Sequence, residues 1–276
     1  MRGWRAAVVA LSALALAACT ARVSGVPDAE VVWTSIVPTV DELPKPGQCT
    51  NTGLDVLDCA AEHEAEVTSV GRLDGLTAEY PEDRDLRRAA LPPCRAALTA
   101  YLGSSDHDAT RLQAQALWPS RDGWARGDRW LLCTVAELKP DGSRVRRKHS
   151  AKDLLKAAGF STVQLCATAS PGKDKDAGIT ACDQPHRAEA VPGVLTLGTP
   201  QDPTPSLDQV NAKAAEHCAK AVRNYVGAAR EDVFASWRAF GSLAWSEGYT
   251  SAVCYAEATR PFTGRLWGLG ANPLPS

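Results

Sequence analysis

Two stretches of the chain carry apolar residues at helical spacing. In the later stretch the capping-box pair Ser206 and Gln209 stands in front, and Gly227 can end the helix. The apolar positions between them are Val210, Ala214, Cys218, Ala221, Val222 and Tyr225. A stripe that recurs every three to four residues predicts an amphipathic helix.

An equivalent stripe lies about 124 residues earlier, and its positions are Leu86, Ala90, Cys94, Ala97, Leu98 and Tyr101. Pro92 and Pro93 fall inside it. Proline lacks the backbone N–H and clashes with the preceding helical turn. The pattern therefore predicts a helix that breaks at these prolines or begins at Pro93.

Strand-like segments accompany each predicted helix. The segments 129–137 and 249–257 are rich in Trp, Tyr, Val and Thr and carry a cysteine in the middle, and the pieces around Cys59 and Cys182 have the same character. Several strands with one main helix predict a small α+β domain, present twice.

The cysteines reveal the duplication. Cys49, Cys59, Cys94 and Cys133 are echoed by Cys166, Cys182, Cys218 and Cys254 at offsets of 117, 123, 124 and 121 residues. The same offset aligns His63 with His186 and Glu66 with Glu189. We therefore expect a tandem repeat of two disulfide-stapled domains. The expected division is a leader at 1–18, a flexible tether at 19–45, the two repeats at 46–155 and 160–265, and a tail at 266–276.

The first residues predict export. Arg2 and Arg5 precede an apolar segment, 6–18, that is too short to cross a bilayer. The sequence "LAAC" ending at Cys19 matches a bacterial lipobox, which implies a diacylated, palmitate-bearing Cys19 at the mature N-terminus. The alternative is an ordinary signal peptide cleaved nearby. Two acyl chains would hold the protein lastingly on the membrane.

Composition narrows the chemistry. A net charge of −2 and a pI near 6.2 give no broad field for nucleic acid. Eight cysteines after Cys19, without any C-x-x-C pair, favour disulfides over a metal site in an oxidising compartment, and we expect no cofactor. Sequence does not determine the pairing, but a repeat should close each unit in the same way. The favoured pairs are Cys49–Cys59, Cys94–Cys133, Cys166–Cys182 and Cys218–Cys254.

The order "GQC", "DC…HEAEV", "C…YLG", "WARGDRWLLC" and "DGS" resembles the septum formation domain family of high-GC Gram-positive bacteria. The second unit keeps the cysteines, His, Glu, Tyr-Val-Gly and Trp but lacks "GDR". The resemblance implies an exported envelope protein, often lipid- or membrane-anchored, with a role around cell division. It supplies no catalytic residues.

The duplicated pairs His63/Glu66 and His186/Glu189 are the best chemical candidates. An H-x-x-E spacing can place both side chains on one helical face as ligands or as acid and base. On a strand, however, positions three apart face opposite ways, and duplication argues against catalysis. We therefore favour a structural role beside a disulfide and keep ligand binding as the alternative.

Trp124, Arg126 and Arg129 form the other candidate binding group, in a turn whose counterpart carries Glu247 and Tyr249 beside Trp245. Trp residues could stack on wall sugars but more often fill cores. The basic run 144–149, "RVRRKH", could touch anionic lipid but more often forms a solvated loop.

These patterns predict a lipid-anchored protein on the extracytoplasmic face of the cell membrane, which binds or scaffolds an envelope protein or wall component. It is not expected to be an enzyme, because no phosphate loop, nucleophile elbow or triad spacing is present in the sequence. The alternative is a wall-ligand-binding or hydrolytic lipoprotein that uses the His/Glu pairs.

Overall fold

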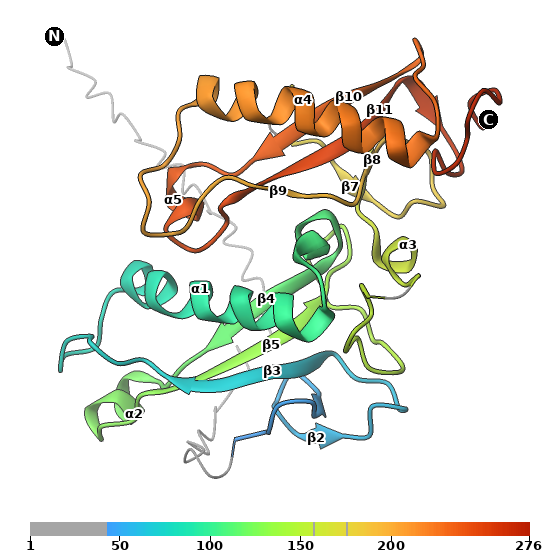
Figure 1. Ribbon diagram of the computed structural model, residues 1–276. Helices are drawn as coiled ribbons and strands as arrows, with labels where there is room; N and C mark the ends of the chain where they lie inside the picture. The colour runs from blue at the N-terminus through green and yellow to red at the C-terminus, as the bar shows by residue number, and fades with distance from the viewer. Residues whose placement is uncertain (1–42, 157, 175) are drawn as a thin grey trace, which may run out of the picture. The chain divides into compact units, whose positions relative to one another are not determined.

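The computed structural model describes residues 43–156, 158–174 and 176–276. They form two α+β halves, one built around each sheet (Figure 1). The predicted leader, Cys19 and nearly all of the predicted tether lie outside the described residues. Among the helices that are described, none has the length and hydropathy needed to cross a membrane.

The first sheet belongs to half 1 and has the strand order β2-β1-β3-β5-β4. All its pairings are antiparallel. Its strands are β1 (Cys49–Thr50), β2 (Val56–Leu57), β3 (Ala65–Arg72), β4 (Leu112–Leu117) and β5 (Trp130–Glu137).

The second sheet belongs to half 2 and has the order β10-β11-β8-β6-β7, with β9 paired to β11. Its strands are β6 (Cys166–Ala167), β7 (Ile179–Thr180), β8 (His186–Ala190), β9 (Leu195–Thr196), β10 (Val233–Ala239) and β11 (Ser251–Phe262). Read in chain order, the five main strands take the same places as those of half 1, which is consistent with a tandem repeat.

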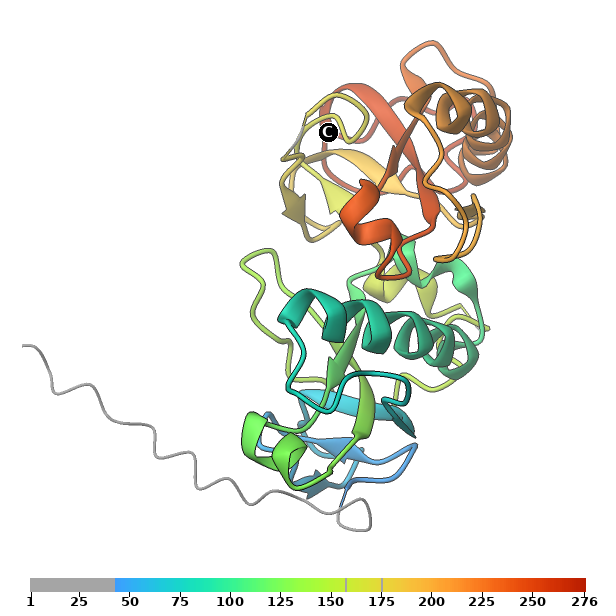
Figure 2. The same cartoon turned by 90° about the vertical axis from the view of Figure 1, so that its left-hand side faces the viewer.

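One long helix packs on each sheet, as both views show (Figures 1 and 2). The helices are α1 (Asp83–Leu102), the 3₁₀ helix η2 (Ser105–Ala109), α2 (Arg121–Ala125), α3 (Phe160–Val163), α4 (Leu207–Val226) and α5 (Ser242–Trp245). Helix α4 begins at the predicted Ser206/Gln209 capping box and ends at Gly227, whose φ of 86° is left-handed.

Helix α1 corrects one expectation, because it runs unbroken through Pro92 and Pro93. Leu86 and Ala90 before the prolines and Leu98 after them are buried on the same core face. The disulfide of Cys94 fixes the helix just beyond. Tertiary packing on both sides therefore outweighs the local cost of the missing backbone hydrogen bonds.

The four disulfides are the pairs that the repeat favoured: Cys49–Cys59, Cys94–Cys133, Cys166–Cys182 and Cys218–Cys254. The two longer ones tie the long helix of each half to the last strand of that half, β5 or β11. The two shorter ones staple the hairpin-like start of each half. Every bridge thus closes within one half.

Both predicted ends of the folded part need adjustment. Leu43, inside the predicted tether, is 4% exposed and packs with Val67, Trp130 and Leu132. Leu266, in the predicted tail, is fully buried in the core of half 2. These apolar side chains cover sheet and helix surface that would otherwise face water, so the fold extends past both expected boundaries.

Candidate functional site

A buried His–Glu pair lies beside the short disulfide of each half. His63 Nε2 is 3.3 Å from Glu66 Oε1, and His63 Nδ1 is 3.0 Å from the carbonyl oxygen of Ala61. A carbonyl oxygen only accepts, so Nδ1 carries a hydrogen. The contact between Nε2 and Oε1 joins the two side chains directly.

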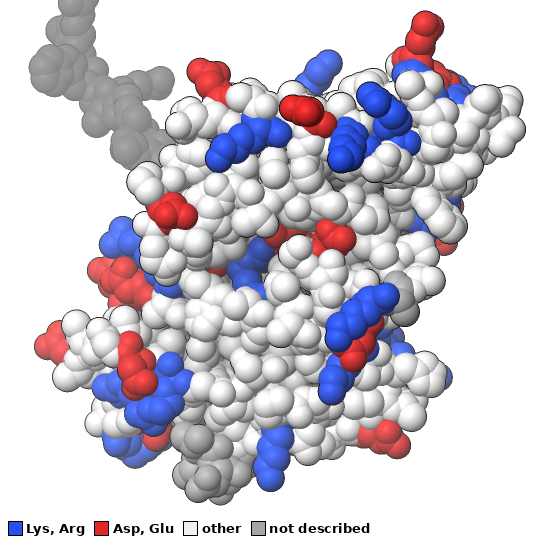
Figure 3. All heavy atoms as spheres, viewed as in Figure 1, with Lys and Arg blue, Asp and Glu red and all other residues white. Residues whose placement is uncertain are grey.

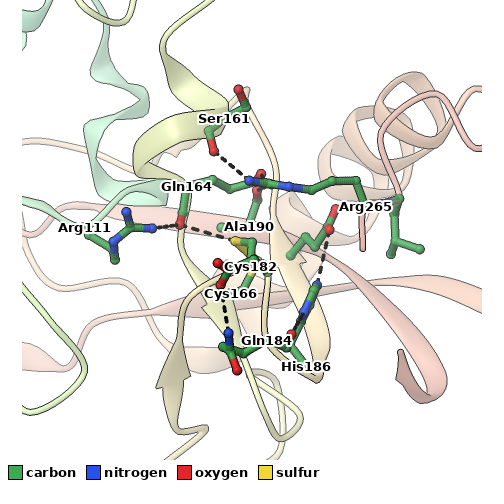
Figure 4. The surroundings of a disulfide bond; sticks show 12 residues. Arg111, Ser161, Gln164, Cys166, Cys182, Gln184, His186, Ala190 and Arg265 are labelled. Atoms are coloured by element: carbon green, nitrogen blue, oxygen red, sulfur yellow. Dashed lines mark hydrogen bonds and ion pairs between the residues drawn. A yellow bond between two sulfur atoms is a disulfide. The ribbon is translucent and has the colours of Figure 1, made fainter. Parts of the chain in front are cut away.

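Half 2 repeats this arrangement. His186 Nε2 is 3.2 Å from Glu189 Oε1, and Nδ1 is 2.7 Å from the carbonyl oxygen of Gln184. Figure 4 shows His186 below the Cys166–Cys182 disulfide, on the side opposite Gln164. All four side chains of the two pairs are at most 2% exposed.

Tyrosines from the long helices complete both clusters. Tyr101 Oη donates to Glu66 Oε2 at 2.8 Å, and Tyr225 Oη donates to Glu189 Oε2 at 2.7 Å. Burial raises the pKa of each tyrosine well above its ordinary value, and the neighbouring carboxylate adds to the effect. Both hydroxyls therefore stay protonated and act as donors.

The carboxylate oxygens receive further hydrogen bonds. Glu66 accepts from Ser150 Oγ at 2.6 Å and from the Ala151 backbone N–H, and Glu189 accepts from the Leu266 backbone N–H at 3.1 Å. Such satisfied, buried carboxylates hold segments of the fold together. The placement favours the structural interpretation of both pairs over ligand binding.

The argument that strand positions three apart face opposite ways was wrong for this cluster. In half 2 the register of β8 with β11 shifts between Glu257 and Phe262, so His186 opposes Phe262 rather than a residue close to Glu257. In half 1 His63 precedes β3 and bridges Arg147 instead. Irregular pairing lets both side chains turn to the same side.

Cys49 with His63 and Glu66, and Cys166 with His186 and Glu189, place three metal-type donor atoms within 4.8 Å of one another. Each of these sulfurs is bonded in a disulfide and offers no thiolate. The remaining His and Glu atoms already bond to each other, so neither cluster fits a metal ion in its oxidised form.

A short helix and turn precede the last strand of each half, and they differ in what they contact. We call Trp124–Arg129 the first turn and Trp245–Thr250 the second turn. Both tryptophans are buried, at 1% and 3% exposure. The backbone N–H of Gly127 donates to the carbonyl of Trp124 at 2.9 Å, and that of Gly248 to the carbonyl of Trp245 at 3.0 Å.

The second turn is docked on helix α1 of half 1. Glu247 accepts two hydrogen bonds of 2.8 Å from Arg87. The carbonyl of Gly248 accepts from Arg95 Nε at 2.8 Å, and the Arg95 guanidinium lies 3.8 Å over the Tyr249 ring. The second turn therefore holds the two halves together.

The first turn has no such neighbour in the part of the chain that the structure describes. A Cβ placed on Gly248 would lie 3.2 Å from Pro92 Cα, whereas a Cβ on Gly127 would meet no described atom within 4 Å. Arg126 is more than half exposed, with its guanidinium 3.8 Å from Asp128. In Figure 3, Lys and Arg side chains gather at the lower left, where Figure 1 places α2. The first turn presents an open surface on which Arg126 is the most exposed charge.

Arg129 is not part of that open surface. Its guanidinium stacks 3.8 Å from the Trp124 ring centroid and donates to the Trp124 carbonyl at 2.9 Å. Trp124 in turn fills the core and donates to the Thr77 carbonyl. Arg129 and Trp124 therefore hold the turn in shape, and Arg126 is its exposed charge.

The basic run 144–149 is largely neutralised by half 1. Arg147 pairs with Glu137, Arg146 lies 3.6 Å from Glu64, and Lys148 lies 3.9 Å from Glu62. Arg144 donates to Gln115. These contacts favour the solvated-loop interpretation over a lipid-binding patch.

Sequence reasoning missed a charged cluster between the halves. Asp108 accepts from Arg95 at 2.6 Å and from Ser251 Oγ at 2.5 Å, and its side chain is 7% exposed. Burial alone would raise the pKa of Asp108, but His107 and Arg95 outweigh burial and hold that pKa far below its ordinary value. Half 1 has three more residues than half 2 between the cysteines of its longer disulfide, 39 against 36, and this difference was the available signal.

It also missed a cleft of about 970 Å³ between the two sheets. Aromatic side chains of Trp118, Phe240 and Tyr249 line it. Tyr255 is 6% exposed, and within the described residues its hydroxyl has no hydrogen-bond partner. Burial raises the pKa of Tyr255 to about 12, so this hydroxyl is a neutral donor facing the cleft.

One family model, described as septum formation, matches residues 44–254 in a single span that runs through both halves. No curated protein and no solved structure matches the chain significantly.

Proposed function

Because the chain belongs to the septum formation family, we propose that it acts as a lipid-anchored binding or scaffolding protein on the extracytoplasmic face of the cell membrane. The family supports a role in the envelope connected with septum formation and cell division. The lipid anchor is proposed from the lipobox that ends at Cys19. Mass spectrometry of the mature N-terminus tests it, and an unmodified downstream N-terminus would refute it.

The observation that carries the binding role is the contrast between the two turns. The same backbone turn occurs in both halves, and in half 2 it binds helix α1 through a side chain and a backbone carbonyl. In half 1 the exposed residues of this turn include Arg126 and Gly127. We propose that the first turn binds an envelope protein.

The Arg126→Glu variant tests this role. Arg126 is exposed and, among the described residues, its only ion pair is the long contact to Asp128, so the fold should lose less than about 0.5 kcal/mol. We expect the variant to capture at least tenfold less of the partner from envelope extract at moderate salt. Lys220→Glu, an equal charge change on exposed α4, is the matched control. Equal capture by both variants and the wild type would exclude the first turn as the interaction surface.

A second candidate function is wall-ligand binding, and the unpartnered Tyr255 hydroxyl favours it. The buried His/Glu pairs do not take part. Instead the cleft offers Gln113 and Gln115 amides, aromatic faces, and the cations Lys139 and Arg144. Of its acids, Asp108 and Glu247 are already paired with arginines. This lining suits a carboxylate-bearing sugar.

Calorimetry with N-acetylglucosaminyl-N-acetylmuramic acid, which carries a carboxylate, and with neutral chitobiose separates the outcomes. We expect binding of the first sugar alone, weakened by Tyr255→Phe. Lack of binding by either sugar would remove this candidate, and equal binding of both would remove the role of the cations.

A further inference from the structure

The docked second turn shows how this turn type recognises a helix. Its acidic Glu247 meets Arg87, and Ser246 Oγ accepts from Arg88 Nε at 3.2 Å. About two turns further along α1, Arg95 reaches the Gly248 carbonyl and stacks on Tyr249. The second turn thus contacts α1 at two main positions, Arg87 and Arg95, which are eight residues apart.

The first turn has the same backbone. The N–H of Asp128 donates to the Gly123 carbonyl at 2.9 Å, as that of Tyr249 does to the Ala244 carbonyl at 3.1 Å. Gly127 and Gly248 have φ values of 96° and 91°. The outward-facing positions therefore coincide, and only their chemistry differs.

Two of those positions have changed character. Arg126 stands where the second turn has Glu247, and Asp128 stands where it has Tyr249. If the first turn binds a helix in the same way, that helix must carry an acidic side chain, opposite in charge to Arg126, at the position that Arg87 has in α1. At the second position a cation would still reach the Gly127 carbonyl, and it would pair with Asp128 instead of stacking on an aromatic ring.

We propose that the first turn binds an α-helix of a partner protein that carries Asp or Glu where α1 carries Arg87, and Lys or Arg eight residues later. This inference rests on the proposed function of the first turn as an interaction surface. It names the chemistry of the partner.

A second molecule of this protein does not provide that helix. The α4 positions equivalent to Arg87 and Arg95 are Asn211 and Ala219. Asn211 is occupied as the acceptor of Trp237 Nε1 at 3.0 Å. Neither position carries the required charge, so the wild-type chain is not expected to associate head to tail through this contact.

Building the missing charges into α4 tests the proposal without knowledge of the natural partner. In the full chain, Asn211→Glu with Ala219→Arg should create a helix that fits the first turn of another molecule. The matched control exchanges the charges, as Asn211→Arg with Ala219→Glu. We expect sedimentation at low salt to show at least tenfold stronger self-association for the first variant. Adding Arg126→Glu to it should abolish the association.

Equal association of the two variants, or none in either, would overturn the proposal. If either variant fails to fold, the same chemistry is tested inside the chain. Glu247→Arg gives the second turn the charge of the first turn and should lower the unfolding free energy. Adding Arg87→Glu to this variant should restore the unfolding free energy. Failure to restore it would equally overturn the proposal. Arg126→Glu could lose capture of the partner from envelope extract while these charge tests fail. That result would leave the proposed function standing and reject only the proposed helix chemistry.

Discussion

The two halves share five main strands, a long helix, two disulfides and a His–Glu–Tyr cluster, but their turns make different contacts. In half 2 the turn is an internal contact that reaches α1. In half 1 the same turn faces solvent and carries the opposite charge at its tip. The duplicated halves therefore share a framework but use the turn differently. The second turn joins the halves, and the first turn is open to a partner.

The disulfides provide the largest test of the shared framework. Replacing Cys94 and Cys133 with alanine should cost about 4 kcal/mol of unfolding free energy, and so should replacing Cys218 and Cys254, because the loops span 39 and 36 residues. Urea unfolding measures both. A large difference between the two losses of unfolding free energy would show that the two halves do not depend equally on their longer disulfides. The unreduced wild type should show no reactive thiol among its eight described cysteines.

The contact between the halves should depend on Asp108. Asp108→Asn leaves the buried Arg95 without its anion and should cost about 3 kcal/mol at pH 7. The folded-state pKa of Asp108 is lowered from the ordinary 3.8, so its stabilisation is complete above that value and is lost as pH falls through the folded pKa.

Denaturation of the wild type and Asp108→Asn across pH checks this prediction. The difference in unfolding free energy should be constant from neutral pH down to about pH 5 and should shrink below pH 3.8. A difference that grew on acidification would contradict the assignment.

The two buried clusters should differ in how much they depend on tyrosine. Glu66 keeps Ser150 and a backbone N–H as donors in Tyr101→Phe, so we expect a loss of about 1.5 kcal/mol. Tyr225 also accepts from Gln164 Nε2 at 2.8 Å, so Tyr225→Phe should cost about 2.5 kcal/mol. Chemical denaturation at neutral pH measures both, and the reverse order would refute this account.

The smallest test compares the two turn glycines. Gly127→Ala should cost about 1 kcal/mol, because its positive φ disfavours a side chain while the space around it is open. Gly248→Ala should cost about 2 kcal/mol, since the added methyl also presses on Pro92 and Arg95. Equal costs, measured by urea unfolding, would mean that the second turn is not docked in solution.

The repeat made the fold class and the disulfide pairs predictable. Cysteines at matching offsets constrain topology, and Ser206 with Gln209 gave the start of α4. Local rules failed at Pro92 and Pro93, where core packing overrides backbone preference. They failed again at His186 and Glu189, where a change of register turns both side chains to one side.

The candidate site was less predictable than the fold. The sequence marked Arg126 and Glu247 as opposite charges on equivalent turns, but it could not show that Glu247 is docked within the chain. It also grouped Arg129 with Arg126, although Arg129 supports Trp124. Exposure depends on contacts between residues far apart in sequence, which a repeat alignment does not contain.

Because every described disulfide closes within one half, the molecule has a built-in mechanical hierarchy. When the chain is stretched from its ends, the loops of 10, 39, 16 and 36 residues are covalently locked and cannot lengthen. The contact between the halves contains ion pairs, hydrogen bonds and apolar contacts but no disulfide among the described residues, so it should yield before either stapled half. We expect optical-trap traces to show an early, small, reversible extension, followed by two short steps that lengthen only after reduction.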